Sequence, residues 1–295
     1  MANQRKHFPK LNTDHLLIVD VESKEVTNKE SQFYGNTYAY DFAAMLINLK
    51  DGLPDRDYQD TMGTLFDHSM EGISYRLWTA KHRKDPVRKN DEGIIKPEDF
   101  WSVTNLKSRK KKYRELYLEG KRSMSVPKMV DDWMGSVLHY NYSRKPVVAA
   151  YNIAYDAMIS GSTSIDNFFS GYYKPYKKGR EPEWLDGVNL PGKGNFVDLY
   201  VIAQKALLRK KAGNKEYEDC EDNPYCDKKL AKRYEQWASK NGYLTKTGRP
   251  ILTAEKLGWF IGNTESMIPE PHTALEDIRF FERHIARWLR QQRFI

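Results

Sequence analysis

Short apolar runs and helical stripes of apolar residues alternate along this chain and predict both strands and helices. Residues 15–21, HLLIVDV, and residues 147–151, VVAAY, are apolar runs rich in small and branched side chains, which is typical of buried strands. Residues 38–49 can form a further strand, and the turn residues 50–52 that follow predict a hairpin into the next segment. The pattern therefore predicts a sheet whose strands come from well-separated parts of the chain.

Four further segments have the spacing or the end signals of helices. Proline at a first helical position, capping hydroxyl and carboxyl groups, and an Asn-Gly pair after a last turn mark their limits. These helices are predicted over residues 127–139, 196–208 with Asp198 near the start, 230–240 and 253–260. Together with the strands, they predict one α/β domain over residues 1–295, with a mixed central sheet flanked by helices.

The last helix is the most strongly patterned segment of the chain. Thr273 and Glu276 match the capping box S/T-x-x-E, which predicts that the helix begins at Thr273. His272 would then precede the helix, Asp277 would lie about one turn inside it, and we expect both side chains to face the same mouth of the fold. A buried stripe at helical spacing follows, formed by Leu275, Ile278, Phe281, Ile285, Trp288 and Leu289.

Composition narrows the class of protein. The chain has 295 residues, of which 40% are hydrophobic and 13% aromatic, so it can bury a full core. No apolar run approaches the roughly 18 residues of a membrane span or the apolar region of a signal peptide. We therefore expect no membrane association and an intracellular, cytoplasmic location. In such a reducing compartment Cys220 and Cys226 are expected to be free thiols, and two cysteines without a nearby histidine do not make a structural zinc site.

Positive charge is concentrated in one part of the chain. The net charge is +8, and residues 81–122 alone hold 14 Lys and Arg against 7 Asp and Glu. Such an excess is typical of proteins that bind nucleic acid, although a charge run is more often only a solvated surface. It lies within residues 53–126, whose weak periodicity and high polarity we interpret as a basic insertion into the core. Its densest basic run is Arg109, Lys110, Lys111 and Lys112, which we expect to contact nucleic acid if the fold holds a nuclease site.

Acidic residues follow the predicted strands at positions that suit a metal ion. Asp20 and Glu22 end the first strand, and residues i and i+2 of a strand share one face about 6–7 Å apart. Asp156 follows the strand at 147–151, in what we expect to be a first helical turn. Each feature alone is weak, since Asp219 and Glu221 match the same Asp-x-Glu spacing in a polar loop. Their occurrence together with the pair at 272 and 277 is what predicts a site.

Three segments resemble the motifs of one enzyme family. Residues 19–23 (VDVES), 151–156 (YNIAYD) and 272–277 (HTALED) occur in the order found in the DEDDh 3′–5′ exonucleases of the ribonuclease H-like superfamily, to which proofreading subunits and oligoribonuclease belong. The resemblance extends over most of the chain, and its style is similar to phage-encoded members, for which the location would be the host cytoplasm. It implies a ribonuclease H-like sheet flanked by helices, with a longer segment before residue 156 than the compact family core needs.

The resemblance also implies a reaction and a set of ligands. Two divalent cations, Mg²⁺ or Mn²⁺, would be held by Asp20, Glu22, Asp156 and Asp277, because hard cations prefer oxygen ligands. By resemblance Asp20 would bridge both ions, Glu22 and Asp277 would hold the ion that carries the attacking water, and Asp156 would act more through water. His272 would be the general base, since histidine ionises close to neutral pH.

Two positions of the motifs imply contacts with the substrate. Ser23 stands where the family more often has threonine, and Asn152 follows Tyr151 where the family more often has His-Asn. We expect Ser23 and Asn152 to contact nucleic acid. The expected partner is a nucleic acid with a single-stranded 3′ end, from which nucleoside monophosphates would be released, and the sequence identifies no protein partner.

Two other functions fit parts of the pattern. A nucleic-acid-binding module with a degenerate site would use the basic segment, but it would not need all four carboxylates and the histidine. A nuclease of short RNA oligonucleotides would need the site, but the basic segment suits a longer polyanion. The choice between DNA and RNA stays open, because it depends on contacts to the 2′ position of the sugar.

Overall fold

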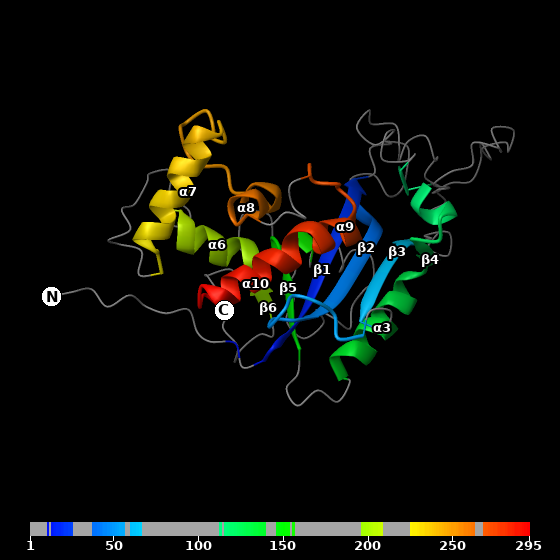
Figure 1. The fold of residues 1–295 in the computed structure, drawn as a ribbon. Helices are drawn as coiled ribbons and strands as arrows, with labels where there is room; N and C mark the ends of the chain where they lie inside the picture. The colour runs from blue at the N-terminus through cyan, green and yellow to red at the C-terminus, as the bar shows by residue number, and fades with distance from the viewer. Residues whose placement is uncertain are drawn as a thin grey trace, which may run out of the picture.

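A six-stranded mixed sheet lies at the centre of the protein, whose structure is a computed structural model (Figure 1). Its strands are β1 (His15–Glu25), β2 (Thr37–Asn48), β3 (Thr61–Phe66), β4 (Ser123–Ser125), β5 (Val147–Ala150) and β6 (Phe196–Asp198). The order across the sheet is β4-β3-β2-β1-β5-β6. β1, β2 and β3 form an antiparallel meander, whereas β1–β5, β5–β6 and β3–β4 pair in parallel. The predicted α/β class with a mixed sheet is confirmed.

Helices flank the sheet. They include α3 (Pro127–His139), α6 (Leu199–Leu207), α7 (Lys228–Lys240), α8 (Ala254–Phe260), α9 (Ala274–Asp277) and α10 (Arg283–Gln291), with the π-helical segment η5 (Ile278–Glu282) between the last two. None of the described helices is long and apolar enough to cross a membrane. The structure describes residues 11, 13–25, 37–56, 60–66, 112–113, 115–139, 146–153, 155–156, 196–208, 225–262 and 268–295.

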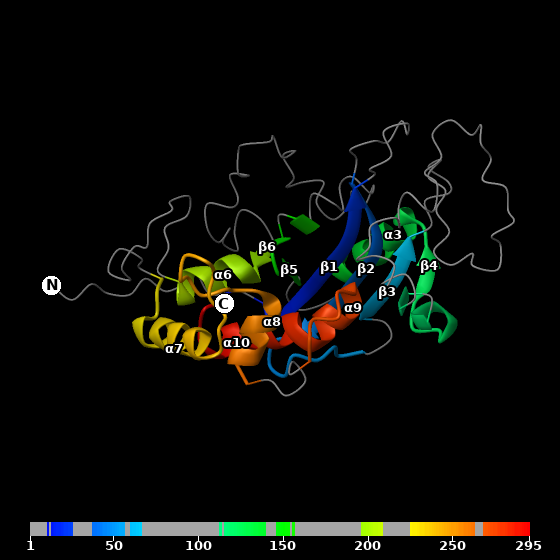
Figure 2. The same cartoon turned by 90° about the horizontal axis from the view of Figure 1, so that it is seen from above.

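The two faces of β1 belong to two separate cores. Figure 2 shows α3 on one side of the sheet and the α9–η5–α10 stretch on the other. Leu16 and Ile18 pack in the core beneath α9–η5–α10, while Leu17 packs in the core beneath α3. Because successive strand side chains point to opposite faces, this alternation places Asp20 and Glu22 on the face that the C-terminal stretch covers.

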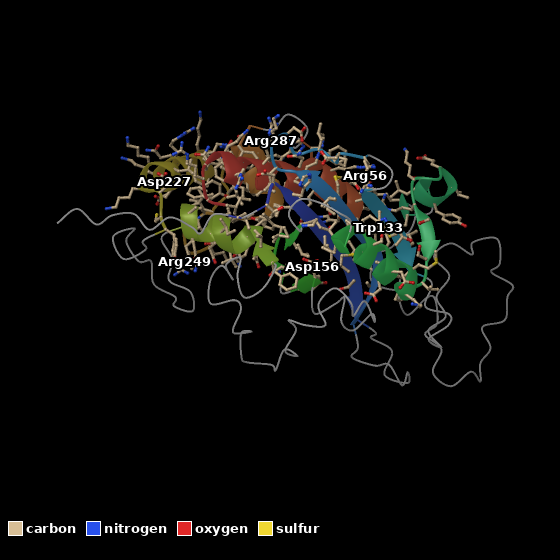
Figure 3. The ribbon with its side chains drawn as sticks, turned by 90° about the horizontal axis from the view of Figure 1, so that it is seen from below. Arg56, Trp133, Asp156, Asp227, Arg249 and Arg287 are labelled. Atoms are coloured by element: carbon tan, nitrogen blue, oxygen red, sulfur yellow. The ribbon has the colours of Figure 1, made fainter. Side chains whose placement is uncertain are left out.

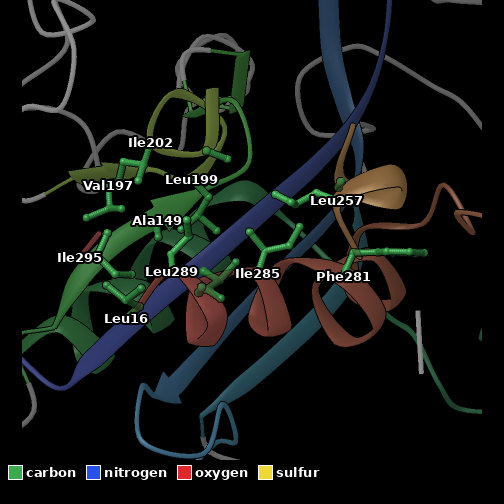
Figure 4. Packing of buried hydrophobic residues seen from close by; sticks show 14 of the residues in the cluster. Leu16, Ala149, Val197, Leu199, Ile202, Leu257, Phe281, Ile285, Leu289 and Ile295 are labelled. Carbon is green, nitrogen blue, oxygen red and sulfur yellow. The ribbon is translucent and has the colours of Figure 1, made fainter. Parts of the chain in front are cut away.

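The C-terminal stretch is fixed on the sheet by its apolar stripe. Phe281, Ile285 and Leu289 are fully buried in the core that this stretch shares with the sheet (Figure 4). Burying each such side chain contributes roughly 1.5–3 kcal/mol, which holds this stretch in one orientation. That orientation turns Asp277 and Glu282 of the same stretch inward, and both are buried. Of the predicted stripe, Trp288 is the member that is only partly buried.

Most predicted elements are confirmed, with one error of type. The strand predicted at residues 15–21 is present and continues to Glu25, and the helices predicted at residues 127–139 and after Thr253 are present. The helix predicted over residues 196–208 is wrong for its first three residues, which form β6. Pairing with β5 supplies their hydrogen bonds, and such a distant partner leaves no mark on local periodicity.

Two strands of the sheet, β3 and β4, come from within residues 53–126, the range that we interpreted as an insertion. β3 pairs with β2 and β4 pairs with β3, so this range contributes to the sheet itself. The residues between 67 and 111, which carry most of the basic excess, lie outside the described residues.

The prediction of free thiols is wrong for Cys226, which is disulfide-bonded. That prediction depends on an assumed reducing compartment, and the sequence alone does not establish one. Cys220, the only other cysteine of the chain, lies outside the described residues.

Candidate metal centre

Six carboxylates line one cavity of about 450 Å³ on the sheet face beneath the C-terminal stretch. They come from the middle of β1, the helical turn after β5, the loop before α9, and the α9–η5 stretch itself. No Lys or Arg is among the described residues that line the cavity. The six are Asp20, Glu22, Asp156, Glu270, Asp277 and Glu282.

The backbone of β1 at Val21 holds two of these acids together. The N–H of Val21 donates to Asp20 Oδ1 at 2.9 Å and lies 3.2 Å from Asp156 Oδ1. Asp156 is on the helical turn that follows β5 (Figure 3), and β5 pairs in parallel with β1. The parallel pairing of residues 16–18 with β5 thus brings the acids in the middle of β1 next to the acid that follows β5.

A separate contact joins the start of the chain to its end. Ligand atoms of Glu22, His272 and Asp277 all lie within 4.8 Å of one another, a spacing that could hold a metal ion. Glu22 is partly buried and Asp277 is buried, whereas the His272 side chain is 52% exposed. The structure therefore brings together three of the five residues predicted to be catalytic. Two of these three, Glu22 and Asp277, also line the cavity together with Asp20 and Asp156.

His272 has an unusual backbone conformation. Its φ is 53°, in the left-handed region that is uncommon for residues other than glycine. Two hydrogen bonds hold the adjoining carbonyl groups: Lys112 Nζ donates to Pro271 O at 3.0 Å, and Tyr113 Oη donates to His272 O at 3.3 Å. Lys112, the last residue of the basic run 109–112, and its neighbour Tyr113 thus fix the backbone that carries the His272 side chain.

The capping of α9 differs from the predicted capping box. Thr273 occupies the N-cap position as predicted, but its hydroxyl donates to Glu276 Oε2 at 2.7 Å and caps no backbone N–H. Instead Asp41 Oδ2 accepts from the N–H of Ala274 at 2.9 Å. The capping box prediction is therefore wrong in its bonds, because an acid from the sheet satisfies the helix end that sequence neighbours were expected to satisfy.

A buried ion-pair network ties this helix start to β4. The side chain of Arg122 is fully buried and forms an ion pair with Glu276. Its Nε atom lies 3.5 Å from Asp41 Oδ1. Burial raises the pKa of Asp41 to about 6, although the charge of Arg122 and the bond from Ala274 both favour its ionised form. Asp41 lies directly opposite Glu22 in the β1–β2 register, so Arg122 also offsets a like-charge pair.

The acids of the cavity repel one another. Burial, followed by the charges of Glu270 and Glu22, raises the pKa of Asp277 to about 9. Burial also raises the pKa of Asp20 well above its ordinary value, and the charge of Glu282 raises it further. The pKa of Asp156 is raised in the same way, first by burial and then by the charge of Asp198. Such a cluster needs either protons or cations to be stable.

The donor atoms present fit divalent cations. Asp277 Oδ1 and Glu282 Oε2 are buried and have no hydrogen-bond partner. Buried carboxylate oxygens without partners destabilise the fold unless a bound cation satisfies them. Carboxylates are ligands that Mg²⁺ and Mn²⁺ prefer. The residues of this cavity are therefore suited to hold Mg²⁺ or Mn²⁺.

The residues predicted to contact nucleic acid have different surroundings. Asn152 lines the cavity, is exposed, and has a φ of 79°. Ser23 hydrogen-bonds through its hydroxyl to Tyr155 Oη at 2.5 Å, and Tyr155 also lines the cavity. Lys112 is engaged with Pro271 O as described. Arg109, Lys110 and Lys111 lie outside the described residues.

Sequence reasoning missed Glu282 and Glu270. Glu282 lies at 3–4 spacing between Ile278 and Ile285, on the buried stripe of the last helix. An acidic residue within an apolar stripe is unusual, so the sequence could have identified Glu282 as a candidate site residue. Glu270 lies in the loop before α9 and carries no such signal. Asp198, interpreted from sequence as a helix-start residue, is the N-cap of α6 and accepts from the N–H of Val201 at 3.1 Å.

Comparison of the chain with protein-family models, with curated proteins and with solved structures finds no match in any of the three. The arguments for function therefore come from the chain itself. They depend on the arrangement of carboxylates around the cavity, on the contacts of His272, and on the charge of the chain.

Proposed function

We propose that this protein is a metal-dependent 3′–5′ exonuclease of the DEDDh type, with a ribonuclease H-like fold. The observation that carries the proposal is the meeting of Glu22, His272 and Asp277 within 4.8 Å, from positions 250 residues apart in the chain. A histidine that meets two acids beside a cavity lined by further carboxylates supplies both a proton acceptor and cation ligands.

Asp20, Glu22, Asp156 and Asp277 would hold the divalent cations. Bound there, such cations would supply the positive charge that neutralises a phosphodiester and stabilises the departing oxygen. The chain's own contribution is to fix these ligands on rigid elements: Asp20 and Glu22 on the central strand, and Asp277 on a helix packed against it. The absence of Lys and Arg among the described lining residues leaves the carboxylates available to a cation.

His272 would act as the general base. Its side chain is half exposed and lies next to the ligands Glu22 and Asp277, so it can reach a water molecule at the cavity mouth. The hydrogen bonds from Lys112 and Tyr113 hold its backbone in place. General-base assistance by a positioned side chain contributes typically 10²–10⁴-fold to a rate.

The substrate would be a nucleic acid, either DNA or RNA, that enters with its 3′ end. The basic excess of residues 81–122 supports a polyanionic substrate. Asn152 and Tyr155 line the cavity and are exposed, so they can meet the terminal nucleotide there. Ser23, which bonds to Tyr155, would act through that tyrosine.

The test is cleavage of 5′-labelled single- and double-stranded DNA and RNA with Mg²⁺, with Mn²⁺ and with EDTA. The proposal predicts products that shorten in single-nucleotide steps with either metal, no cleavage in EDTA, and no cleavage by Asp20→Ala. Metal-dependent cleavage that persists in Asp20→Ala would overturn the assignment of the site. Binding without cleavage would favour a nucleic-acid-binding module instead.

A further inference from the structure

Glu282 lies in the cavity, yet the exonuclease motifs do not include it. Its side chain is buried, with 4% of its surface exposed, and it lines the same cavity as Asp20, Asp156 and Asp277. A glutamate so deeply buried is uncommon unless a partner of opposite charge is present. No cationic side chain is among the described residues that line this cavity, so a bound cation can take the place of that partner.

One oxygen of the Glu282 carboxylate is buried without a hydrogen-bond partner among the described residues. The carboxylate lies near the backbone N–H of Tyr151, at the end of β5. Oε2 is buried without any hydrogen-bond partner, as is Asp277 Oδ1 in the same cavity. A buried carboxylate oxygen that no described protein group satisfies is suited to bind a cation.

The helix that carries Glu282 departs from α-helical geometry at this position. η5 is a π-helical segment that ends at Glu282, between two α-helical stretches. A π-helical turn inserts one extra residue into a helix and turns the following side chains relative to the preceding ones; such turns are frequent at functional sites. Here the insertion lets Asp277 and Glu282, five residues apart on one helix, both line the cavity.

We propose that Glu282 is a fifth carboxylate ligand of the cation site, in addition to the four that the exonuclease motifs supply. This inference rests on the proposed function, because it assigns a further residue to the same site. Glu282 would contribute its Oε2 from the side of the cavity formed by the C-terminal stretch. The site would then hold divalent cations more tightly than four carboxylates allow, because affinity rises with ligand charge.

Mn²⁺ binding measures this role without reference to activity. Wild type, Glu282→Gln, Asp20→Asn and Asp227→Asn are titrated with Mn²⁺ and followed by electron paramagnetic resonance of the free ion. Asp227→Asn is the control, because Asp227 caps α7, does not line the cavity, and asparagine caps a helix equally well. We expect Glu282→Gln to weaken Mn²⁺ binding at least about tenfold, as Asp20→Asn does, and Asp227→Asn to change it less than about twofold.

The outcomes separate the two claims. If Glu282→Gln binds Mn²⁺ as wild type does while Asp20→Asn does not, the role of Glu282 is refuted and the proposed function stands. If wild type itself binds no Mn²⁺, both fail. Glu282→Asp retains the charge but withdraws it by one methylene, so it serves if the glutamine variant does not fold. Mn²⁺ affinity within about twofold of wild type in Glu282→Asp would then overturn the proposal.

Discussion

Asp41 Oδ2 accepts a hydrogen bond of 2.9 Å from the backbone N–H of Ala274, which lies 233 residues further along the chain. Asp41 is on β2, directly opposite Glu22 of β1, and Ala274 is the first residue of the helix that carries Asp277. One carboxylate of the sheet therefore fixes the helix start relative to the strand, and with it the distance between Glu22 and Asp277. The geometry of the candidate site depends on this contact.

Arg122 is the charge that permits this contact, and its removal should destabilise the fold. Arg122→Met would leave Asp41 buried without its cation and would break the pair with Glu276. Removing one partner of a buried ion pair costs about 3–5 kcal/mol, and we expect a loss of that size in urea unfolding. The control is Lys128→Met, which breaks the exposed pair with Asp132 and should cost less than about 1 kcal/mol. Equal losses in the two variants would mean that the buried network is not what holds the helix start.

Lys112 should act on the rate of the reaction and not on binding. It was predicted from sequence to contact nucleic acid, whereas in the structure its ammonium group donates to Pro271 O, beside His272. We expect Lys112→Met to slow single-turnover cleavage by about tenfold, equivalent to about 1.4 kcal/mol, with substrate affinity and its salt dependence unchanged. Lys110→Met is the comparison, and it should weaken binding and reduce the salt slope. A reduced salt slope in Lys112→Met would show that this lysine does bind phosphate.

His272 should be needed for the rate of cleavage and not for binding of the nucleic acid. We expect His272→Gln to lower the single-turnover rate by roughly 10²–10⁴-fold while the affinity for a single-stranded oligonucleotide changes less than about twofold. His15→Gln is the control, because His15 lies at the other end of β1 and bonds to Asp55. A rate within about threefold of wild type in His272→Gln would exclude the histidine as the base.

Without metal, stability should fall as pH rises. The acids of the cavity have raised pKa values in the folded protein, to about 9 for Asp277. A raised pKa means that the folded state binds the proton more tightly than the unfolded state, so this contribution is complete below about pH 4 and is lost progressively toward pH 9. In EDTA we expect the melting temperature to fall by on the order of 5 °C between pH 5 and 8, and Mg²⁺ to restore it.

The control for this pH effect is Asp277→Asn, which removes one of the shifted groups. Its melting temperature in EDTA should depend less on pH between 7 and 9 than that of wild type. A melting temperature that rises with pH in EDTA would contradict the picture of crowded, buried acids.

Local patterns in the sequence were enough to find much of the fold. The apolar run that ends at Asp20, the helix after Pro127 and the cap at Thr253 are each encoded by neighbouring residues, and the structure has all three. β6 was missed because its hydrogen bonds come from β5, which is about 50 residues away in sequence. A strand of three residues is also too short to show a period of two.

The site was less readable than the fold. The motifs identified Asp20, Glu22 and Asp277, but they gave no indication that Asp41 and Arg122 would hold the helix start. Those contacts depend on β2 and β4 lying close to α9, which only the folded chain determines. The π-helical turn at Ile278–Glu282 is equally hidden, because the apolar stripe continues through it with ordinary helical spacing.

The most direct test of the central claim uses a single-stranded oligonucleotide with a label at its 5′ end and a radioactive phosphate in its last linkage. With Mg²⁺, wild type and the control Asp227→Asn should release the radioactivity as a nucleoside monophosphate in the first cleavage step, when the 5′-labelled strand has lost a single nucleotide. Asp277→Asn should release none. Release from the 5′ end, cuts within the strand, or a wild-type rate in Asp277→Asn would contradict the account.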